Sequence, residues 1–150
     1  MKILRSLIPP QSQPSKLLIR FANESVSAGF PSPADDYLDV AIDLNEQLIQ
    51  HPASTFLLRV SGNSMTGAGI HNNDVLIVDR SLDPQPGHIV VAVLDGNFIL
   101  KRLVVKNAVP FFEADNPDYT PIDLRQYNDV HIWGVATHSI HNLRNIKPSR

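Results

Sequence analysis

The segment IVVAVLDGNFILKRLVV, residues 89–105, carries the clearest structural signal in the chain. Two runs rich in valine, isoleucine and leucine flank Asp95-Gly96, a dipeptide that favours the positive φ angles of a type I′ turn. The segment therefore predicts a β-hairpin, with strands over residues 89–94 and 98–105 joined by a two-residue turn.

Further strands are predicted on both sides of this hairpin, over residues 55–60, 75–78, 109–114 and 130–138. The run 75–78 is wholly apolar, which is typical of a buried strand. A short helix is expected over residues 44–50, because Asp43 followed three residues later by Glu46 resembles a capping box, and Pro52 ends the pattern. The predicted fold is therefore mostly β, with several short strands around one core and one short helix.

The first 28 residues are the least core-like part of the chain. Pro9, Pro10 and Pro14 argue against a helix or a central strand there, since proline lacks the backbone donor that both need. A cluster of apolar residues follows, at positions 17, 18, 19 and 21. We predict an extended N-terminal arm over residues 1–28, a β domain over residues 29–143 and a flexible tail over residues 144–150.

Composition narrows the class of protein. A chain of 150 residues with 43% hydrophobic and 19% charged residues is typical of one soluble globular domain. The net charge of −2 and the pI near 6.3 argue against strong nonspecific binding to nucleic acid. The absence of cysteine excludes disulfides and a cysteine nucleophile. Because no secretory signal or membrane span is recognisable, we expect a cytoplasmic protein.

Lys101 occupies an unusual place in the hairpin. A strand period of two puts Lys101 on the same face as Ile99, Leu103 and Val105, so the chain places an amine on an otherwise apolar face. Desolvation there favours the neutral amine, which is the form that can act as a base. The alternative is an edge-strand lysine that extends its amine to water.

Ser64 is the candidate partner of Lys101, 37 positions earlier, in the segment Val60-Ser61-Gly62-Asn63-Ser64-Met65. A serine hydroxyl needs a neighbouring base to become a nucleophile. Gly62 and Gly67 are expected to adopt positive φ and so to present Ser64 in a tight loop, with Met65 as a packing residue. Ser64 has a simpler interpretation as a turn-capping residue, and the residue pattern alone leaves the pairing open.

Other nucleophile arrangements fit less well. The serine-hydrolase elbow requires a glycine where Thr66 stands, and an alternating strand–helix pattern that this chain lacks. Six histidines keep a Ser–His mechanism open in principle, although none has an evident orienting partner: His51, His71, His88, His131, His138 and His141. No metal site is expected, because no carboxylate–histidine cluster surrounds His138 and His141, and no cofactor is expected either.

The Ser64 segment resembles the nucleophile segment of the LexA/UmuD self-cleaving peptidases. Ser61-Gly62-Asn63-Ser64-Met65, the following stretch through Asp79, and the 37-residue step to a lysine within an apolar strand all match that family. Residues 26–29, Val-Ser-Ala-Gly, resemble its self-cleavage site. Residues 29–34, 42–45 and 48–52 are similar to the UmuD branch of the family, and the resemblance extends from about residue 29 to residue 143.

The resemblance implies a chemistry and a fold. Ser64 is expected to be the nucleophile and Lys101 the general base, with the backbone N–H groups of Asn63 and Ser64 as oxyanion donors. Cleavage is expected between Ala28 and Gly29, and the UmuD branch carries cysteine where this chain has Ala28. The implied fold is a folded-over, partly barrel-like β domain that forms a homodimer.

Partners follow from the resemblance as well. It implies self-cleavage stimulated by RecA filaments on single-stranded DNA in the SOS response to DNA damage. The shortened homodimer is then expected to join a UmuC-like, Y-family polymerase subunit in error-prone translesion synthesis. Membranes and direct, strong nucleic-acid binding are not expected.

Three other classes of protein share part of this pattern. A LexA-like repressor is disfavoured, because a helix-turn-helix domain of roughly 60 residues or more is expected to precede the cleavage site and the arm has only 28. A signal-peptidase relative shares the Ser–Lys chemistry, but it is expected to carry a membrane anchor. A catalytically idle binding module with the same fold stays open and differs in one respect: loss of Ser64 would change nothing in it.

Overall fold

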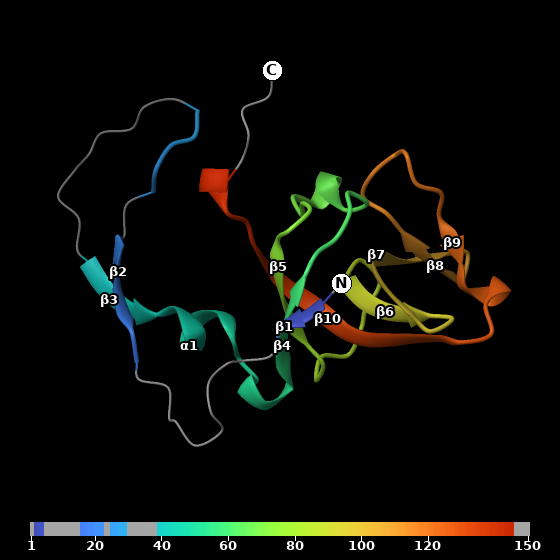
Figure 1. Cartoon of the computed structure of the whole chain (residues 1–150), viewed down its shortest axis with the longest axis horizontal. Coiled ribbons are helices and arrows are strands. Elements are labelled where there is room, and N and C mark those ends of the chain that lie inside the picture. Colours follow the sequence, from blue (N-terminus) through green and yellow to red (C-terminus); the bar gives the residue numbers. More distant parts are fainter. Residues whose placement is uncertain (1, 5–15, 23–24, 30–38, 146–150) are drawn as a thin grey trace. The chain divides into compact units, whose positions relative to one another are not determined.

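The computed structural model describes residues 2–4, 16–22, 25–29 and 39–145 of the chain (Figure 1). The chain divides into two compact units. The large unit comprises Met1–Ser6 and His51–Arg150, and the small unit comprises Leu7–Gln50.

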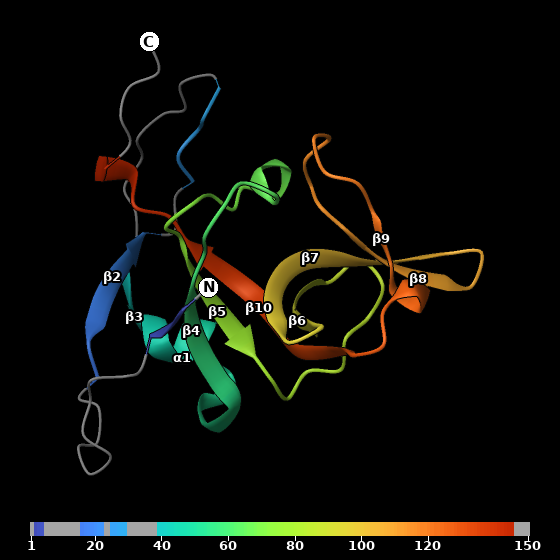
Figure 2. The same ribbon diagram turned by 45° about the vertical axis from the view of Figure 1, so that its right-hand side comes forward.

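The large unit is built on one antiparallel sheet of eight strands, in the order β1-β4-β5-β10-β6-β7-β8-β9. The strands are β1 (Lys2–Leu4), β4 (Thr55–Arg59), β5 (Val75–Asp79), β6 (Ile89–Leu94), β7 (Asn97–Lys106), β8 (Val109–Glu113), β9 (Ile122–Asp123) and β10 (Val130–Ile140). Short 3-10 turns lie between them: η1 (Pro52–Ser54), η2 (Thr66–Ala68), η3 (Leu124–Gln126) and η4 (Leu143–Asn145). The mostly β fold is confirmed. The sheet is open, with β1 and β9 as its edges among the described strands, and β7 curves strongly along its length (Figure 2).

The predicted hairpin is confirmed as β6 and β7. Leu94 pairs with Asn97 across the two-residue turn. Asp95 has φ 45° and Gly96 has φ 81°, the two positive angles that a type I′ turn requires. The primed turn matches the right-handed twist of the strands and so fixes their register. That register sets Lys101 opposite Val90.

Strand β10 joins the two halves of the sheet. Its first half pairs with β6 and its second half with β5, and the register shifts once along each pairing. Such irregularities bend a strand and increase its twist, which allows one strand to serve two parts of a folded sheet. Gly134 lies where β10 passes close to β5, since an added Cβ would stand 2.6 Å from Val78 Cγ1.

Two apolar clusters fill the two sides of the sheet. One contains Leu58, Val60, Met65, Ile70, Leu76, Val78, Val91 and Leu100, and the other contains Val90, Ala92, Leu103, Phe112 and Val135. Val90, Val91 and Ala92 are all fully buried, although neighbouring side chains point to opposite faces of a strand. The uninterrupted apolar run in β6 therefore reflects a strand covered on both faces.

Strand β1 was not predicted from the sequence. Lys2–Leu4 pairs with β4 at the edge of the large sheet, with Lys2 opposite Arg59. The proline-rich stretch that led to the prediction of an arm lies in residues 5–15, outside the described residues. The predicted tail also lies largely outside them, beyond residue 145.

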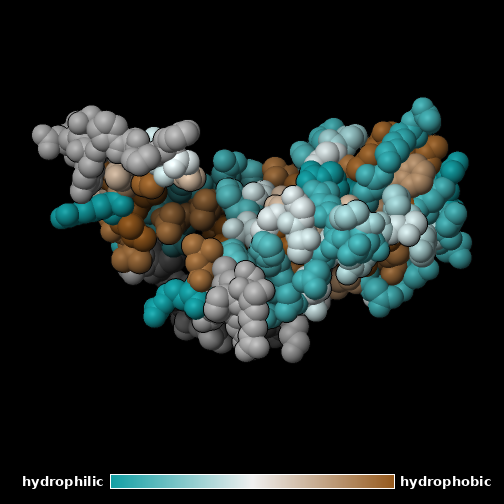
Figure 3. Space-filling view, turned by 90° about the horizontal axis from the view of Figure 1, so that it is seen from above, coloured by the Kyte–Doolittle hydropathy of each residue, from teal (hydrophilic) through white to brown (hydrophobic). Residues whose placement is uncertain are grey.

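The small unit contains β2 (Leu18–Ala22), β3 (Asp39–Asp43) and α1 (Leu44–Leu48). β2 and β3 pair antiparallel, and neither was predicted. The predicted helix is confirmed and ends slightly earlier than expected. Asp43 caps it, because its carboxylate accepts the backbone N–H of Asn45 at 2.9 Å. Large apolar side chains are exposed on this unit (Figure 3), among them Leu18, Ile19 and Phe21.

In the part of the chain that the structure describes, no helix has the length and apolar character needed to cross a membrane.

Candidate active site

Ser64 lies in a loop that leaves β4 and returns to β5. The base of the loop is closed by two backbone hydrogen bonds: Val60 N–H donates to the carbonyl of Asp74 at 2.8 Å, and Asn73 N–H donates to the carbonyl of Val60 at 2.9 Å. Gly62 adopts φ 101°, as predicted, and its N–H donates to Asn72 Oδ1 at 2.9 Å. The loop is thus braced on both sides of Ser64.

The prediction of a positive φ at Gly67 is wrong. Gly67 lies within η2, and positive φ falls at Gly69, which ends that turn. Glycine is required at position 67 for a different reason: an added Cβ would stand 2.4 Å from the carbonyl oxygen of Asp115. The Gly67 N–H donates to the same oxygen at 2.7 Å, so the absence of a side chain permits this close approach.

Met65 anchors the loop in the core. It is 2% exposed and packs with Leu58 and Leu76, which confirms the predicted packing role. Its sulfur also accepts a weak hydrogen bond from the Asp115 N–H at 3.4 Å. Because Met65 is immobilised, the backbone of its neighbour Ser64 has little freedom to move.

Lys101 lies in β7, opposite Val90 of β6. β8 pairs with β7 on its other side from Arg102 onward, so β7 is not an edge strand and the edge-strand alternative is wrong. Ile99 and Leu103, the neighbours of Lys101 on the same face, both belong to or pack against the second core cluster. The lysine side chain is half-buried, and this burial lowers the pKa of its amine below the ordinary value.

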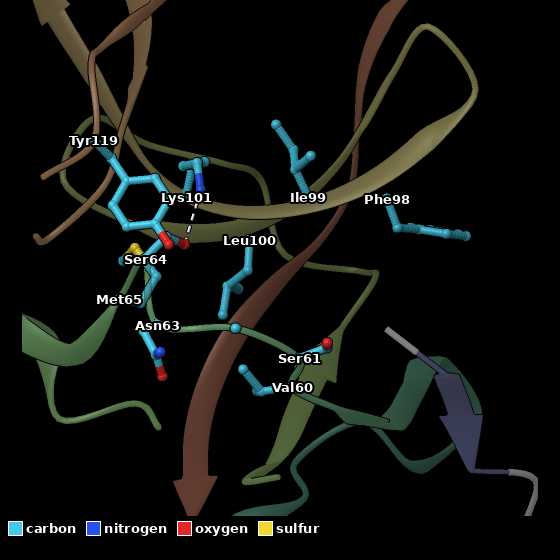
Figure 4. Close-up of a pocket in the computed structure, with 11 residues that line it drawn as sticks. Val60, Ser61, Asn63, Ser64, Met65, Phe98, Ile99, Leu100, Lys101 and Tyr119 are labelled. Carbon is cyan, nitrogen blue, oxygen red and sulfur yellow. Dashed lines mark hydrogen bonds between the residues drawn. The ribbon is translucent and has the colours of Figure 1, made fainter. Parts of the chain in front are cut away.

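The structure brings Ser64 and Lys101 together. The Nζ atom of Lys101 lies 2.8 Å from Ser64 Oγ, within hydrogen-bond distance, and the two side chains point toward each other (Figure 4). They line a cavity of about 240 Å³, between the loop that follows β4 and the first half of β7. The ring of Tyr119 closes one side, with its centre 5.5 Å from Lys101 Nζ.

The backbone N–H groups of Asn63 and Ser64 belong to the loop that lines the cavity. Within the described part of the chain, the N–H groups of Asn63 and Ser64 donate to no acceptor. The carbonyl of Asn63, in contrast, accepts a hydrogen bond from Asn116 Nδ2 at 2.8 Å.

The contacts described for the six histidines are with residues other than Ser64. His51 hydrogen-bonds to Asp79, His141 to Asp74, His138 to Thr137, and His88 to the Gln85 N–H. His131 lies 3.6 Å from Asp129, and the rings of His71 and His141 are in tilted contact, with their centres 4.7 Å apart. Among the described residues, Lys101 is thus the basic side chain that contacts Ser64.

Ala28 and Gly29, the residues of the predicted cleavage site, belong to the small unit and are exposed. An added Cβ at Gly29 would have no heavy atom within 4 Å. Cleavage at this bond stays a prediction.

The segment Asp115–Tyr119 was missed from the sequence as part of the site. It contacts the Ser64 loop through Asp115 and Asn116, and it supplies Tyr119 to the cavity. One signal was present, since Asn116-Pro117 is a dipeptide typical of turns. Nothing in the pattern, however, indicated which part of the fold this turn would contact.

Comparison with known proteins identifies the class to which this site belongs. Residues 20–137 match the Peptidase S24-like family, which is most of the chain. The chain therefore belongs to this family of peptidases, and the resemblance to the LexA/UmuD peptidases is confirmed.

Named relatives cover most of the same region. Protein ImpA of Salmonella typhimurium is 45% identical over 122 residues, which cover 80% of this chain and 81% of that protein. Protein MucA of Escherichia coli is 44% identical over 123 residues, covering 81% and 84% respectively. Protein SamA of Salmonella typhimurium is 38% identical over 138 residues, covering 92% and 96%.

Proposed function

We propose that this protein is a latent serine peptidase that cuts its own backbone between Ala28 and Gly29. Ser64 is the nucleophile and Lys101 the general base. One observation carries the proposal: Ser64 Oγ lies 2.8 Å from an amine that is half-buried and has a lowered pKa. A lysine that loses its proton more readily than usual, next to a hydroxyl, is the arrangement that activates a serine.

The reaction takes two steps. Neutral Lys101 accepts the Ser64 proton while Oγ attacks the carbonyl carbon of Ala28, and the lysine then gives that proton to the departing amine of Gly29. This leaves an ester between Ser64 and Ala28. In the second step Lys101 takes a proton from water, the hydroxide attacks the ester carbon, and the proton returns to Ser64 Oγ.

The backbone supplies the electrostatic part of catalysis. Both steps place negative charge on the former carbonyl oxygen of Ala28, and the N–H groups of Asn63 and Ser64 are the proposed donors to it. Their lack of an acceptor among the described residues supports this role, because donors already in use would have to break a bond first.

Tethering can take the place of tight substrate binding in such a peptidase. The bond to be cut belongs to the same chain as Ser64, so its effective concentration is high and tight binding is not needed. Small residues at the junction, Ala28 and Gly29, keep the reacting backbone accessible.

The wider role is proposed from the resemblance to the UmuD branch and from similarity to proteins ImpA, MucA and SamA. We propose a cytoplasmic homodimer that acts in the SOS response, where RecA filaments on single-stranded DNA stimulate self-cleavage. The shortened dimer then serves as the accessory subunit of a UmuC-like, Y-family translesion polymerase.

Self-cleavage tests the proposal directly. Purified protein incubated at alkaline pH is expected to yield a larger fragment whose N-terminal sequence starts at Gly29. Ser64→Ala and Lys101→Ala should each lower the first-order rate by about 10⁴-fold or more, and the double variant should be no slower, because the two residues act as a unit.

Circular dichroism provides the control, since both variants should retain the β signal of the wild type. Cleavage of the Ser64→Ala variant at the wild-type rate would contradict the proposed nucleophile. A protein that never cleaves, with or without RecA filaments, would instead be a binding module that has kept the fold.

A further inference from the structure

The side chain of Asn116 bridges two segments of the site. Its Nδ2 donates to the carbonyl of Asn63 at 2.8 Å, and its Oδ1 accepts the N–H of Asp118 at 3.0 Å. The two contacts require different ends of the amide, because a carbonyl can only accept and an N–H can only donate. Both ends of the side chain are therefore fixed.

The bond to Asn63 acts on the peptide unit that joins Asn63 to Ser64. The carbonyl oxygen of Asn63 and the N–H of Ser64 belong to this one planar unit, and no cis peptide bond occurs among the described residues. In a trans unit the oxygen and the N–H point in opposite directions. Holding the oxygen therefore sets the direction of the N–H, and a hydrogen bond to the oxygen polarises the N–H as a donor.

The segment that carries Asn116 is itself firmly attached. The carboxylate of Asp115 accepts hydrogen bonds from the guanidinium of Arg102, with Nε 2.9 Å from Oδ1. The backbone carbonyl of Asp115 accepts the N–H of Gly67. Arg102 follows Lys101 in β7, so this segment is fastened both to the strand that holds Lys101 and to the loop that holds Ser64.

We infer that Asn116 is a positioning residue that aims the Ser64 N–H at the oxygen on which charge develops during peptide cleavage. The inference rests on the proposed function, because it assigns a purpose to Asn116 only if Ser64 is the nucleophile. Asn116 itself touches no reacting atom and acts through the Asn63–Ser64 peptide.

The loop offers a matched control. Asn72 is a second asparagine that braces the same loop, but its Oδ1 accepts from Gly62 N–H, on a different peptide unit. Replacement by aspartate keeps an acceptor and removes the donor. Asn72→Asp therefore retains its bond to Gly62, while Asn116→Asp keeps the contact with Asp118 and loses the bond to Asn63.

The test is the first-order rate of self-cleavage as a function of pH in full-length protein. Asn116→Asp and Asn116→Ala are each expected to lower the maximal rate at least about tenfold, a part of the 10²- to 10³-fold lost when an oxyanion donor is removed. Asn72→Asp should cleave within about threefold of the wild type. In Asn116→Ala, which adds no charge, the midpoint of the pH profile should not move, because Lys101 titrates as before.

Three results would overturn the inference. Asn116→Ala could cleave at the wild-type maximal rate, or Asn72→Asp could lose as much activity as Asn116→Asp, which would indicate bracing of the loop alone. A displaced midpoint in Asn116→Ala would show that the residue acts on the base. If circular dichroism shows that Asn116→Ala does not fold, the maximal rate of Asn116→Asp is compared with that of the wild type instead. Ser64→Ala distinguishes failure of the proposed function from failure of this inference. Wild-type cleavage by Ser64→Ala would refute the proposed function. An inactive Ser64→Ala together with a fully active Asn116→Ala would refute this inference alone.

Discussion

Ser64 and Lys101 are held in place by different means. Ser64 depends on a loop whose base is closed by backbone hydrogen bonds and whose next residue, Met65, is anchored in the core. Lys101 depends on the register of β7 with β6, which sets it opposite Val90. The loop can present a hydroxyl to a substrate, while the sheet partly shields an amine from water.

Keeping Lys101 half-buried has a consequence for stability. Its pKa is lowered in the folded protein by desolvation, so the unfolded chain binds the proton more tightly. Between the folded and the unfolded pKa the unfolded state carries more protons, and stability therefore rises with pH across that window. At pH values below this window, burial of the charged amine destabilises the fold.

Lys101→Met is expected to abolish cleavage and yet to raise the melting temperature at pH 7, because it removes that desolvation penalty while filling similar space. The gain should shrink as pH rises through the alkaline range. Thermal unfolding followed by circular dichroism at several pH values measures it. Lys106→Met is the control, since the exposed amine of Lys106 pairs with Glu113 at the surface. A lower melting temperature for Lys101→Met at pH 7 would contradict the account.

At the residue scale, sequence reasoning succeeded where a simple period applied. Alternation along β7 placed Lys101 beside Ile99 and Leu103, and the apolar character of Met65 predicted its burial. It failed at Gly67, whose glycine serves a close approach to Asp115 rather than a positive φ. Contacts between segments far apart in the chain leave no periodic trace in the sequence.

Among the elements, β10 depends on a close approach to β5. An added Cβ at Gly134 would stand 2.6 Å from Val78 Cγ1, and Val78 is fully buried and branched at Cβ, so it cannot turn away freely. Glycine at this position allows the two strands to pack where β10 changes partners.

Gly134→Ala is expected to destabilise the protein by about 1–3 kcal/mol, the range for overpacking a well-filled core. Urea unfolding measures the loss. Combining it with Val78→Ala should recover part of this loss, because the shortened side chain no longer meets the new methyl group. If the two effects simply add, the contact with Val78 is not the cause of the destabilisation.

The hairpin of β6 and β7 was predictable because Asp95-Gly96 encodes the turn locally. β10 was predicted as a strand, but its dual pairing was not, since the register shifts depend on neighbours contributed by two distant strands. β1 and the β2–β3 pair were missed for a related reason. Each of these strands pairs with a strand from a separate stretch of the chain, and the residues of a short strand do not indicate which strand it will pair with.

On the scale of the whole molecule, buried carboxylates connect separate parts of the large unit. Asp79, at the end of β5, is 5% exposed and accepts hydrogen bonds from His51, Ser54 and Ser81. Burial alone would raise the pKa of Asp79, but these hydrogen bonds outweigh it and hold the pKa well below the ordinary value of 3.8. A group with a depressed folded pKa stabilises the protein above its unfolded pKa, and this contribution is lost as the pH falls below 3.8.

Asp79→Asn is expected to destabilise the protein by about 1–3 kcal/mol at pH 7, because it replaces charge-assisted hydrogen bonds in a buried site. Its stability should then fall less steeply than that of the wild type in acid. Urea unfolding between pH 7 and pH 3 provides both readings. The exposed Asp118→Asn serves as control and should follow the wild-type curve. Parallel acid curves for Asp79→Asn and the wild type would show that Asp79 does not contribute to the acid transition.

The central claim is that Lys101 is the base for Ser64, and chemical replacement of its amine tests it most directly. The protein contains no cysteine, so Lys101→Cys introduces a single thiol that 2-bromoethylamine converts into a lysine analogue with sulfur in place of one methylene. Sulfur withdraws electrons and lowers the pKa of the amine relative to that of lysine.

The measurement is the pH profile of the self-cleavage rate before and after this modification, with Ser64→Ala/Lys101→Cys treated alike as the inactive control. We expect the unmodified Lys101→Cys variant to stay intact and the modified protein to cleave, with its alkaline rise displaced to lower pH than in the wild type. Cleavage by the unmodified variant at the wild-type rate, or restored cleavage with an undisplaced pH profile, would contradict the assignment of Lys101 as the base.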